Sequence, residues 1–437
     1  MATPTASLPV ASTPQPEPEA VLRAVWGHAS FRPGQREVVG EVLSRRDCLA
    51  VMPTGAGKSV TFQLPARVAA MCVLVISPLL ALMRDQVAGA SARGLRATWV
   101  DSTLSRSERD TRLEGVRGGA WELVYVSPEG LPGVVGDVRG HIGLIAVDEA
   151  HCISEWGHDF RPAYREIGRA RELLGDVPIL AVTATATARV AADIVRSLAL
   201  KDPYVWRGSF FRPNLCLAAR AKDRLTDARR TVLQAVDAHD GASGIVYCLS
   251  RRDAGALATY LRAHGRTAAP YHAGMDPGVR EQVQAAFSSG EVATVVATVA
   301  FGMGIDKADV RYVVHADLPG SVEAYAQEIG RAGRDGRSSD CLLLYSWSDV
   351  RRRLAMTSGL AGERRVDVRG RLLDLYRFAR GETCRHRCLC AHFGEDSGPC
   401  RGACDACGGR SAEQMLASQE LPLRLIEWDD RPERSIS

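Results

Sequence analysis

Two consecutive series of short apolar runs, separated by amphipathic segments, restrict what this chain can fold into. The runs are apolar at nearly every position, which indicates strands buried on both faces, as in a parallel sheet. The first series comprises residues 48–52, 72–77, 121–127, 142–147 and 178–183, and the second comprises 244–249, 267–271, 294–298, 311–315 and 341–345. Helical patterns include 187–200, 253–264, 277–288 and 321–331. The alternation predicts two α/β lobes with doubly wound parallel sheets, whose ligands bind at the carboxyl ends of the strands.

The remaining segments suggest where these lobes begin and end. Residues 1–18 are mainly Ala, Thr, Ser and Pro, a composition that cannot bury a core and predicts a disordered tail. We expect the first lobe over 19–206, the second over 207–346, a small helical subdomain over 347–410 and a C-terminal tail over 411–437. The chain has no apolar run of about 18 residues and no start that resembles a secretion signal. A cytoplasmic protein that does not bind membranes is therefore expected.

The first predicted strand leads into the loop Met52-Pro-Thr-Gly-Ala-Gly-Lys-Ser59 and then into a predicted helix, which is the context of a P-loop. Gly55 and Gly57 would let the backbone turn its N–H groups toward a phosphate. Lys58 would reach the β- and γ-phosphates of a nucleotide, and Ser59 would hold Mg²⁺. Met52 stands where the strict pattern has its first glycine, so a glycine-rich turn with a surface lysine is the alternative.

A second acidic signal follows an apolar run, in the segment Leu144-Ile-Ala-Val-Asp-Glu-Ala-His151. Asp148 and Glu149 end a predicted strand, where adjacent side chains can diverge around one site. We expect Asp148 to hold Mg²⁺ and Glu149 to orient or deprotonate an attacking water. The alternative is an acidic cap between a strand and a helix.

Several segments resemble motifs of the RecQ family of superfamily 2 DNA helicases. Residues 148–151 resemble the family's Asp-Glu-Ala-His box, 26–35 its motif 0, 152–161 its aromatic-rich loop, 297–306 its motif V and 327–334 its motif VI. These motifs occur in the family's order over about residues 20–407. The resemblance implies two RecA-like lobes and an enzyme that hydrolyses ATP, moves 3′ to 5′ on single-stranded DNA and unwinds duplexes. Its partners would be single-stranded and tailed duplex DNA in bacterial repair or recombination, at the nucleoid.

The resemblance also implies roles for individual residues. The nucleotide would be bound by motif 0 and the P-loop, through His28, Arg32, Gln35, Thr54, Gly55, Gly57, Lys58 and Ser59. Position 28 usually has a larger aromatic residue in the family, so His28 is expected to stack less well on adenine. Catalysis would use Lys58, Asp148, Glu149, Gln327, Arg331 and Arg334. The aromatic loop would sense single-stranded DNA through Trp156, His158, Phe160 and Arg161, and its alternative role is an aromatic plug in the lobe core.

The two motif VI arginines are three residues apart on a predicted helix, so Arg331 and Arg334 should project from one face. From the second lobe they would reach the γ-phosphate and stabilise transferring charge, as an arginine finger does. A solvated basic helix face is the alternative. If the two halves of the active site lie on different lobes, ATP binding would close the cleft and hydrolysis would open it.

The cysteines are concentrated near the C-terminus, where 6 of the 12 lie between residues 384 and 407. A local cysteine cluster without a secretion signal indicates a metal site. By the family pattern, the zinc ligands are Cys384, Cys400, Cys404 and Cys407, and four protein ligands make the zinc structural. Cys388 lies one helical turn from Cys384 and could substitute. We expect Cys388 and Cys390 to be packing residues and metal loss to leave the ATP chemistry without a direct effect.

The stretch after Cys407 has 30 residues, which is shorter than the winged-helix and helical domains that usually follow in the family. The sequence therefore resembles a short form of RecQ without those domains. This leaves a second function in view, a DNA-stimulated ATPase that acts as a nucleotide-switched DNA-binding or strand-annealing protein and unwinds weakly.

Overall fold

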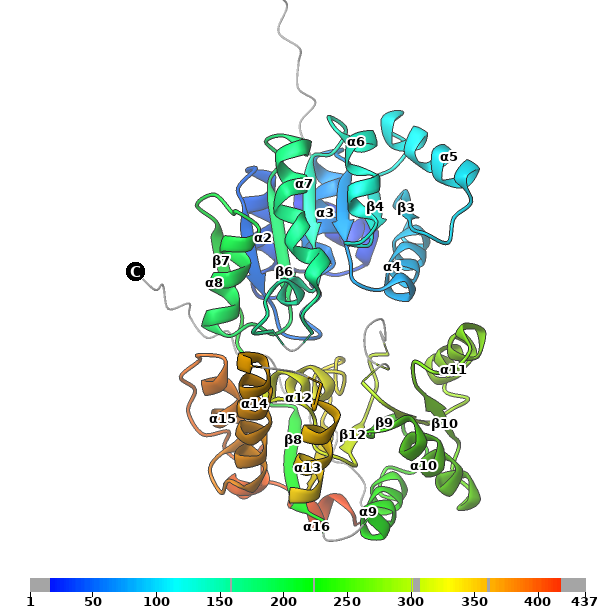
Figure 1. Ribbon diagram of the computed structural model, residues 1–437, viewed down its shortest axis with the longest axis vertical. Helices are drawn as coiled ribbons and strands as arrows, with labels where there is room; N and C mark the ends of the chain where they lie inside the picture. Colours follow the sequence, from blue (N-terminus) through cyan, green and yellow to red (C-terminus); the bar gives the residue numbers. More distant parts are fainter. Residues whose placement is uncertain are drawn as a thin grey trace, which may run out of the picture.

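The computed structural model describes residues 16–157, 159–222, 225–299, 301, 307–359 and 362–417. It contains two α/β lobes that lie one above the other in Figure 1, with a helical region beside the second lobe. The predicted DNA-sensing residue His158, most of motif V and most of the two predicted tails lie outside the described residues.

The first lobe is built on a seven-stranded parallel sheet in the order β3-β4-β2-β5-β6-β1-β7. Its strands are β1 Cys48–Val51, β2 Val73–Ile76, β3 Ala97–Val100, β4 Leu123–Val126, β5 Leu144–Val147, β6 Ile179–Thr183 and β7 Tyr204–Arg207. Five of these strands coincide with the predicted runs. The two unpredicted strands, β3 and β7, are the edges of the sheet, and β7 is only half buried.

Helices cover both faces of this sheet because its strands are apolar on both sides. Along β5, Leu144 and Ala146 pack with α2, α3 and α4, whereas Ile145 and Val147 pack with α7 and α8 on the other face. The helical elements are α1 Pro18–Val21, η1 Leu22–Trp26, α2 Gln35–Leu43, α3 Val60–Val68, α4 Leu80–Ala92, α5 Arg106–Arg117, η2 Leu131–Gly133, α6 Val135–Val138, η3 Ala150–Ile153, η4 Pro162–Glu166, α7 Ile167–Leu174 and α8 Ala188–Ser197.

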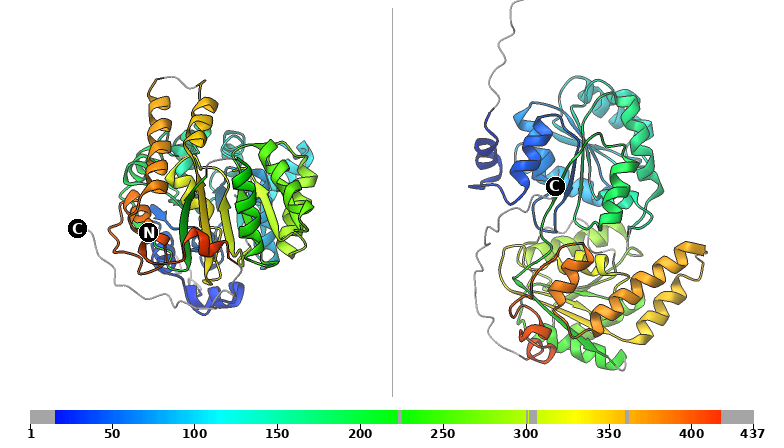
Figure 2. Two further views of the ribbon diagram at one scale, coloured as in Figure 1. Left: turned by 90° about the horizontal axis from the view of Figure 1, so that it is seen from below. Right: turned by 90° about the vertical axis from the view of Figure 1, so that its left-hand side faces the viewer.

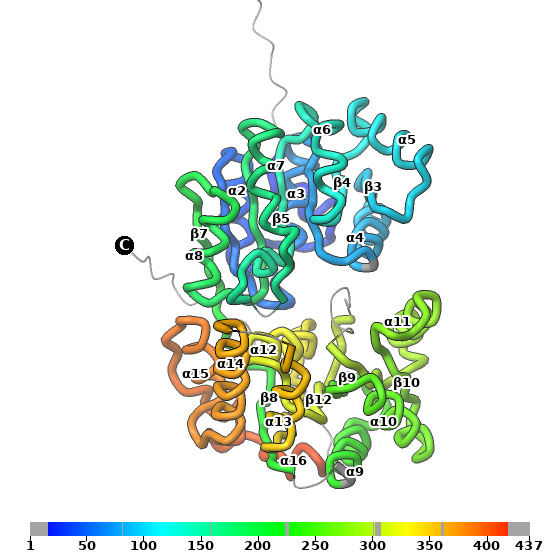
Figure 3. Tube along the Cα trace, viewed as in Figure 1, coloured from blue at the N-terminus to red at the C-terminus, as the bar shows by residue number. Residues whose placement is uncertain are grey.

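The second lobe has a six-stranded parallel sheet in the order β10-β11-β9-β12-β13-β8. Its strands are β8 Leu215–Ala221, β9 Gly244–Tyr247, β10 Ala268–Tyr271, β11 Thr294–Ala297, β12 Tyr312–His315 and β13 Ser339–Tyr345. Its helices are α9 Leu225–Asp237, α10 Arg251–Ala263, α11 Pro277–Ser289 and α12 Val322–Ile329. The tube trace in Figure 3 follows the single passage from β7 of the first lobe to β8 of the second.

The helical region after β13 attaches to the β8 edge of the second sheet. Helices α13 Trp347–Met356 and α14 Gly362–Arg380 form a pair that projects from the lobe (Figure 2), and α15 Arg385–His392 and η5 Asp405–Cys407 follow. Leu217 of β8 pairs in parallel with Cys404, and its N–H donates to the Ala403 carbonyl at 3.0 Å. The fold class predicted from the sequence, two RecA-like lobes followed by a small helical subdomain, is confirmed.

The ends of the predicted domains shift slightly in the structure. Helix α1 already begins at Pro18, and α16 Ala412–Met415 buries Ala412 and Met415 against the core of the second lobe. The folded part therefore extends beyond residue 410. In the part of the chain that the structure describes, no helix is both long enough and apolar enough to cross a bilayer.

The strand order explains why the sequence motifs meet in space. Strands β2, β5, β6 and β1 are neighbours in the first sheet, and the P-loop follows β1 whereas the acidic box follows β5. Parallel strands present their carboxyl ends at one edge, so the P-loop and the acidic box gather there. The seam with the second lobe runs along this same edge, as the contacts below show.

Candidate nucleotide and nucleic-acid site

The P-loop runs from the end of β1 to the start of α3. Gly55 and Gly57 have φ angles of 88° and 76°, in the left-handed region that glycine adopts without strain. A methyl group at Gly57 would lie 2.5 Å from the Gln35 side-chain nitrogen, so a larger residue there would have to displace the Gln35 amide. Lys58 is half buried and close enough to Asp148 for its charge to favour the carboxylate. The predicted phosphate loop and the predicted metal-binding acid are thus neighbours.

Asp148 is buried at the end of β5 and is held by several hydrogen bonds. Its carboxylate accepts from Gln86 Nε2 at 3.0 Å and from the Glu149 backbone N–H at 2.9 Å, and its carbonyl accepts from the Tyr164 hydroxyl at 2.9 Å. Burial and the neighbouring Glu149 raise the pKa of Asp148 to about 6, although Lys58 opposes this shift. A buried carboxylate oriented in this way suits a divalent cation.

Glu149 turns away from the strand direction through an unusual backbone conformation. Its φ of 47° lies in the left-handed region, which costs a non-glycine residue about 1–3 kcal/mol. The turn places its carboxylate 3.3 Å from His151 Nδ1, and the same nitrogen lies 2.9 Å from the Thr183 hydroxyl. Glu149, the residue predicted to activate water, is therefore linked through His151 to the end of β6, where the segment before α8 begins.

Motif 0 contacts the P-loop directly. The Gln35 amide, which is 2% exposed, donates to the Ala56 and Gly57 carbonyls at 3.0 Å each and accepts from the Arg32 backbone N–H at 2.9 Å. The Arg32 guanidinium donates to the Gly55 carbonyl. Both amide hydrogens of Gln35 are therefore in use, and donation to adenine would require one of them to leave the P-loop. His28 is exposed, as an adenine-stacking residue must be.

The motif VI arginines follow α12 rather than lying on it. The helix ends at Ile329, and Arg331 and Arg334 lie in the turns after it, so the expectation that both project from one helix face is wrong. Gly330, the C-cap of this helix, packs closely against the P-loop, because a methyl group there would lie 2.8 Å from Thr54 Cβ. Gln327 is half buried on the last turn of α12.

The two arginines have different surroundings. Arg331 is 6% exposed and lies close enough to the buried phenol of Tyr247, within the second lobe, for its charge to oppose the rise that burial causes in the pKa of Tyr247. Arg334 is half buried, and its Cγ would lie 3.5 Å from a methyl group placed on Gly55. Arg334 is therefore the motif VI arginine whose side chain lies against the P-loop of the opposite lobe.

Sequence reasoning missed two residues that the structure places at this seam. Gln86 lies on α4, and its bond to Asp148 was not foreseen. Arg212 lies in the linker between the lobes, and its guanidinium donates to the Thr54 carbonyl at 3.0 Å. A buried arginine in a linker is a weak sequence signal, although the Arg-Pro-Asn run at 212–214 marks a restricted backbone.

The aromatic loop lies beside the acidic box and has several cationic neighbours. The Arg189 guanidinium carbon lies 3.2 Å from the centre of the Trp156 ring, and Arg165 and Arg364 lie 5.1 and 5.2 Å from the centre of the Phe160 ring. Both aromatic side chains are half buried. They are therefore neither a fully buried plug nor free in solvent.

Two further contacts tie this loop to its surroundings. Arg161 donates to the Pro78 carbonyl at 2.6 Å, which connects the loop to the segment after β2. Arg371 of α14 donates to the Gly157 carbonyl at 2.8 Å. The loop is thus in contact with the C-terminal helical region as well as with its own lobe.

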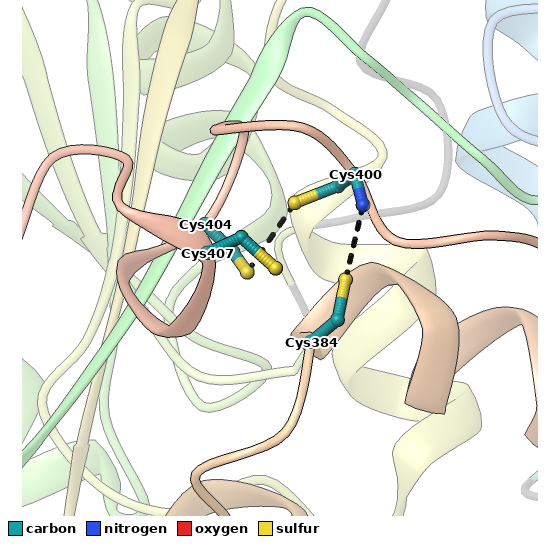
Figure 4. A group of neighbouring side chains, drawn as sticks. All are labelled: Cys384, Cys400, Cys404 and Cys407. Atoms are coloured by element: carbon teal, nitrogen blue, oxygen red, sulfur yellow. Dashed lines mark hydrogen bonds between the residues drawn. The ribbon is translucent and has the colours of Figure 1, made fainter.

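The four cysteines selected by the family pattern come together in space (Figure 4). The sulfur atoms of Cys384, Cys400, Cys404 and Cys407 all lie within 4.8 Å of one another, which suits tetrahedral Zn²⁺ with sulfur–sulfur distances of about 3.8 Å. Although burial raises it, backbone N–H groups of Arg387 and Cys400 lower the pKa of Cys384 to about 7, so its thiolate forms readily.

Cys388 and Cys390 lie outside this cluster. Cys384 is the N-cap of α15 rather than part of it, and Cys388 approaches the Thr383 hydroxyl at 3.1 Å instead of the four sulfurs. Cys390 is buried, and burial raises its pKa to about 12. This geometry supports the interpretation of both as packing residues.

The cysteine region also contacts the seam between the lobes, which the sequence did not suggest. Glu395 accepts from the Ser209 hydroxyl at 2.5 Å and from the Phe210 backbone N–H at 2.7 Å, and Phe210 stacks on Phe393 with ring centres 4.0 Å apart. His392 lies 2.8 Å from Glu323 of α12. The region is therefore packed against the interlobe linker and the motif VI helix, both of which border the nucleotide site.

Two RecA-like lobes that meet at a P-loop and an acidic box define a class of nucleoside triphosphatases. Comparisons with known proteins refine this class. Residues 32–194 match the DEAD/DEAH box helicase family, 227–336 the helicase conserved C-terminal domain and 347–408 the RecQ zinc-binding family. The chain belongs to the RecQ family.

Individual relatives support this assignment. The chain is 41% identical over 394 residues to the ATP-dependent DNA helicase RecQ of Pasteurella multocida, covering 89% of this chain and 61% of that protein. It is 38% identical over 420 residues to the RecQ helicase of Bacillus subtilis, covering 93% of this chain and 70% of that protein. It thus spans about three fifths of the Pasteurella relative. The helicase MrfA bound to DNA has the same fold, with a TM-score of 0.64, 18% identity and coverage of 79% of this chain and 50% of that one.

Proposed function

We propose that this protein is an ATP-dependent DNA helicase that moves 3′ to 5′ on single-stranded DNA and unwinds tailed duplexes in bacterial repair or recombination. The observation that carries the proposal is the seam, where the P-loop of one lobe faces motif VI of the other. The contact of Gly330 with Thr54 and of Arg334 with Gly55 supports a nucleotide site shared by both lobes. A shared site makes lobe closure depend on nucleotide state, which is the minimal requirement for stepping along a strand.

Each candidate residue has a role in this proposal. The P-loop with Lys58 binds the triphosphate, motif 0 binds adenine, and Glu149 orients the attacking water. Ser59 and Asp148 would hold Mg²⁺, which neutralises phosphate charge when bound. Gln327, Arg331 and Arg334 complete the site from the second lobe. The cysteine cluster would hold a structural Zn²⁺.

DNA would run past the aromatic loop, where Trp156 and Phe160 offer ring faces for bases and nearby arginines attract phosphates. Stacking on aromatic side chains is tolerant of sequence, which suits a motor that must pass every base. Arg161 joins this loop to the backbone after β2. Action on DNA would place the protein in the cytoplasm, at the nucleoid.

The decisive experiment compares ATP hydrolysis with and without single-stranded DNA and then measures strand displacement. We expect DNA to stimulate hydrolysis and a 3′-tailed duplex to be separated, whereas a 5′-tailed duplex of the same sequence serves as the polarity control. DNA-stimulated hydrolysis without any displaced strand would favour the second candidate, a nucleotide-switched binding or annealing protein. Absence of hydrolysis would reject both.

Replacing Lys58 with alanine should abolish ATP hydrolysis while DNA binding persists. The P-loop lysine is the cation that approaches the β- and γ-phosphates, and the remaining loop glycines cannot supply its charge. Lys201→Ala is the matched control, since Lys201 lies in the same lobe and is exposed in a pair with Asp176. Hydrolysis by Lys58→Ala at the wild-type rate would show that the P-loop assignment is wrong.

Replacing Trp156 with alanine should uncouple hydrolysis from DNA. We expect a basal ATPase rate within about twofold of wild type, little stimulation by single-stranded DNA, and DNA binding weakened by about 1–3 kcal/mol for a lost stacking contact. Trp156→Phe, which keeps a ring, should retain stimulation, and Trp121→Ala controls for loss of another half-buried tryptophan. Unchanged stimulation in Trp156→Ala would mean that the loop only packs against the lobe.

A further inference from the structure

The linker between the two lobes contains an arginine that joins the two halves of the nucleotide site. Arg212 lies between β7 and β8 and is 9% exposed. Its Nη1 donates to the Thr54 carbonyl of the P-loop at 3.0 Å. Its Nη2 donates to the Ala332 and Gly333 carbonyls of motif VI at 3.2 and 3.0 Å. One guanidinium therefore bridges the backbone of the first lobe and the backbone of the second.

The motif VI turn is further held by the same linker. Asn214 Nδ2 donates to the Gly333 carbonyl at 2.9 Å and to the Arg337 carbonyl at 3.0 Å, and Arg212 Nε donates to Asn214 Oδ1 at 3.3 Å. Gly333 has a φ of 56°, and a methyl group there would lie 2.4 Å from Asn214 Nδ2. The linker and the turn that contains Arg334 are thus built as one unit.

Other elements fix the linker from its opposite side. Phe210 stacks on Phe393, and His386 Nε2 lies 3.0 Å from the Leu215 carbonyl. Within the described residues, no carboxylate lies at ion-pair distance from Arg212, and burial lowers its pKa from the usual value for arginine. The buried guanidinium donates hydrogen bonds to four neutral acceptors, which are three backbone carbonyls and the Asn214 side-chain oxygen. This arrangement suits a residue that connects two backbone segments rather than one that neutralises an acid.

We propose that Arg212 is a positioning residue that sets the distance between the P-loop and Arg334 of motif VI. The inference rests on the proposed ATP hydrolysis at the seam. Arg212 does not need to touch the nucleotide, because it acts by holding the Thr54 carbonyl and the motif VI turn at a fixed distance from each other. A displacement of about 1 Å at a reacting centre can lower the rate about 100-fold. A small loosening of the contacts that Arg212 makes should therefore lower kcat measurably.

The test compares Arg212→Ala and Arg212→Lys with Arg353→Ala. We expect both Arg212 variants to lower kcat for ATP by about 10- to 100-fold, with KM for ATP changed by less than about threefold because the first lobe builds the P-loop alone. Lysine keeps the charge but cannot span both backbones. Arg353 also donates to a carbonyl, that of Leu318, but this contact joins α13 to the second lobe and does not reach the first lobe, so Arg353→Ala should keep wild-type kcat. Wild-type kcat in Arg212→Lys would overturn the bridging role.

A double variant separates positioning from a general loss of structure. If Arg212 acts through Arg334, then Arg212→Ala added to Arg334→Ala should slow hydrolysis by less than about threefold beyond Arg334→Ala alone. Multiplied effects would mean that Arg212 acts independently, and they would overturn the proposal. Thermal unfolding of all variants identifies any that fail to fold.

A second measurement does not depend on hydrolysis. Small-angle X-ray scattering of the nucleotide-free full chain should give a larger radius of gyration for Arg212→Ala than for wild type and Arg353→Ala, because a bridge between lobes is lost. An unchanged radius of gyration together with unchanged kcat would reject the inference. If wild type hydrolyses no ATP, the proposed function fails, and scattering alone still decides whether Arg212 joins the lobes.

Discussion

Arg334→Ala is expected to lower kcat for ATP hydrolysis by about 10³–10⁵-fold, the range found for arginine fingers. Its side chain crosses the seam and lies against Gly55, so alanine would remove the cation that we propose to face the transferring phosphoryl group. Binding of ATP should change much less, because the P-loop and motif 0 lie in the first lobe. DNA-stimulated hydrolysis and binding of a fluorescent ATP analogue, measured on the same preparation, test both statements.

Arg337→Ala is the matched control for this experiment. Arg337 lies three residues further along, its side chain is exposed, and only its backbone carbonyl is bound by Asn214. We expect wild-type hydrolysis from it. If Arg334→Ala weakened binding of ATP by the same factor as it lowered kcat, the arginine would stabilise bound ATP in the ground state rather than the transition state.

Cys404→Ser is expected to remove bound zinc and unfold the region after α14. Cys404 is fully buried in the four-sulfur cluster and pairs with Leu217 at the edge of the second sheet. Zinc contributes about 10–16 kcal/mol of apparent binding free energy in isolated zinc-finger peptides, and three thiolates with a serine bind it far less well. Metal content by mass spectrometry and limited proteolysis of residues 384–410 provide the measurements.

The control is Cys388→Ser, whose thiol is half buried and outside the cluster. It should retain one zinc per chain and resist proteolysis as wild type does. A zinc-replete, stable Cys404→Ser protein would instead assign the fourth ligand to Cys388 or Cys390. Because Glu395 and Phe393 hold the interlobe linker, we also expect zinc loss to reduce ATP hydrolysis, which the sequence did not suggest.

The strands that the sequence revealed are the interior strands of both sheets and one edge strand, β10. Strands such as β5 have both faces buried, so nearly every residue is apolar and the run stands out. Strands β3, β7 and β8 were missed, and each lies at a sheet edge. An edge strand has a neighbour on one side only, so its side chains are less uniformly buried and its composition resembles that of a loop.

The motifs were recognisable because phosphate and metal chemistry demands particular residues in consecutive order. Gly55, Gly57 and Lys58 belong to one short loop, and Asp148 and Glu149 end one strand, so local sequence contains the whole pattern. The end of α12 was misjudged for the opposite reason. The sequence predicts that the helix continues to Arg331, but in the structure it ends at Ile329. The next residue, Gly330, packs closely on Thr54 of the other lobe, which is a contact that the local sequence does not show.

The sequence by itself determined the two-lobed α/β fold, the position of the P-loop and acidic box, and the cysteine-rich segment near the C-terminus, whereas the choice of four ligands within that segment came from the resemblance to the RecQ family. Those features depend on periodicity and on residue types that are close along the chain. Only the tertiary structure decided which motif VI arginine faces the P-loop, that Arg212 bridges the lobes, and that the cysteine region holds the linker. These contacts join backbone carbonyls and side chains more than 100 residues apart. Every residue has a backbone carbonyl, so the sequence does not indicate which carbonyl a distant side chain will bind.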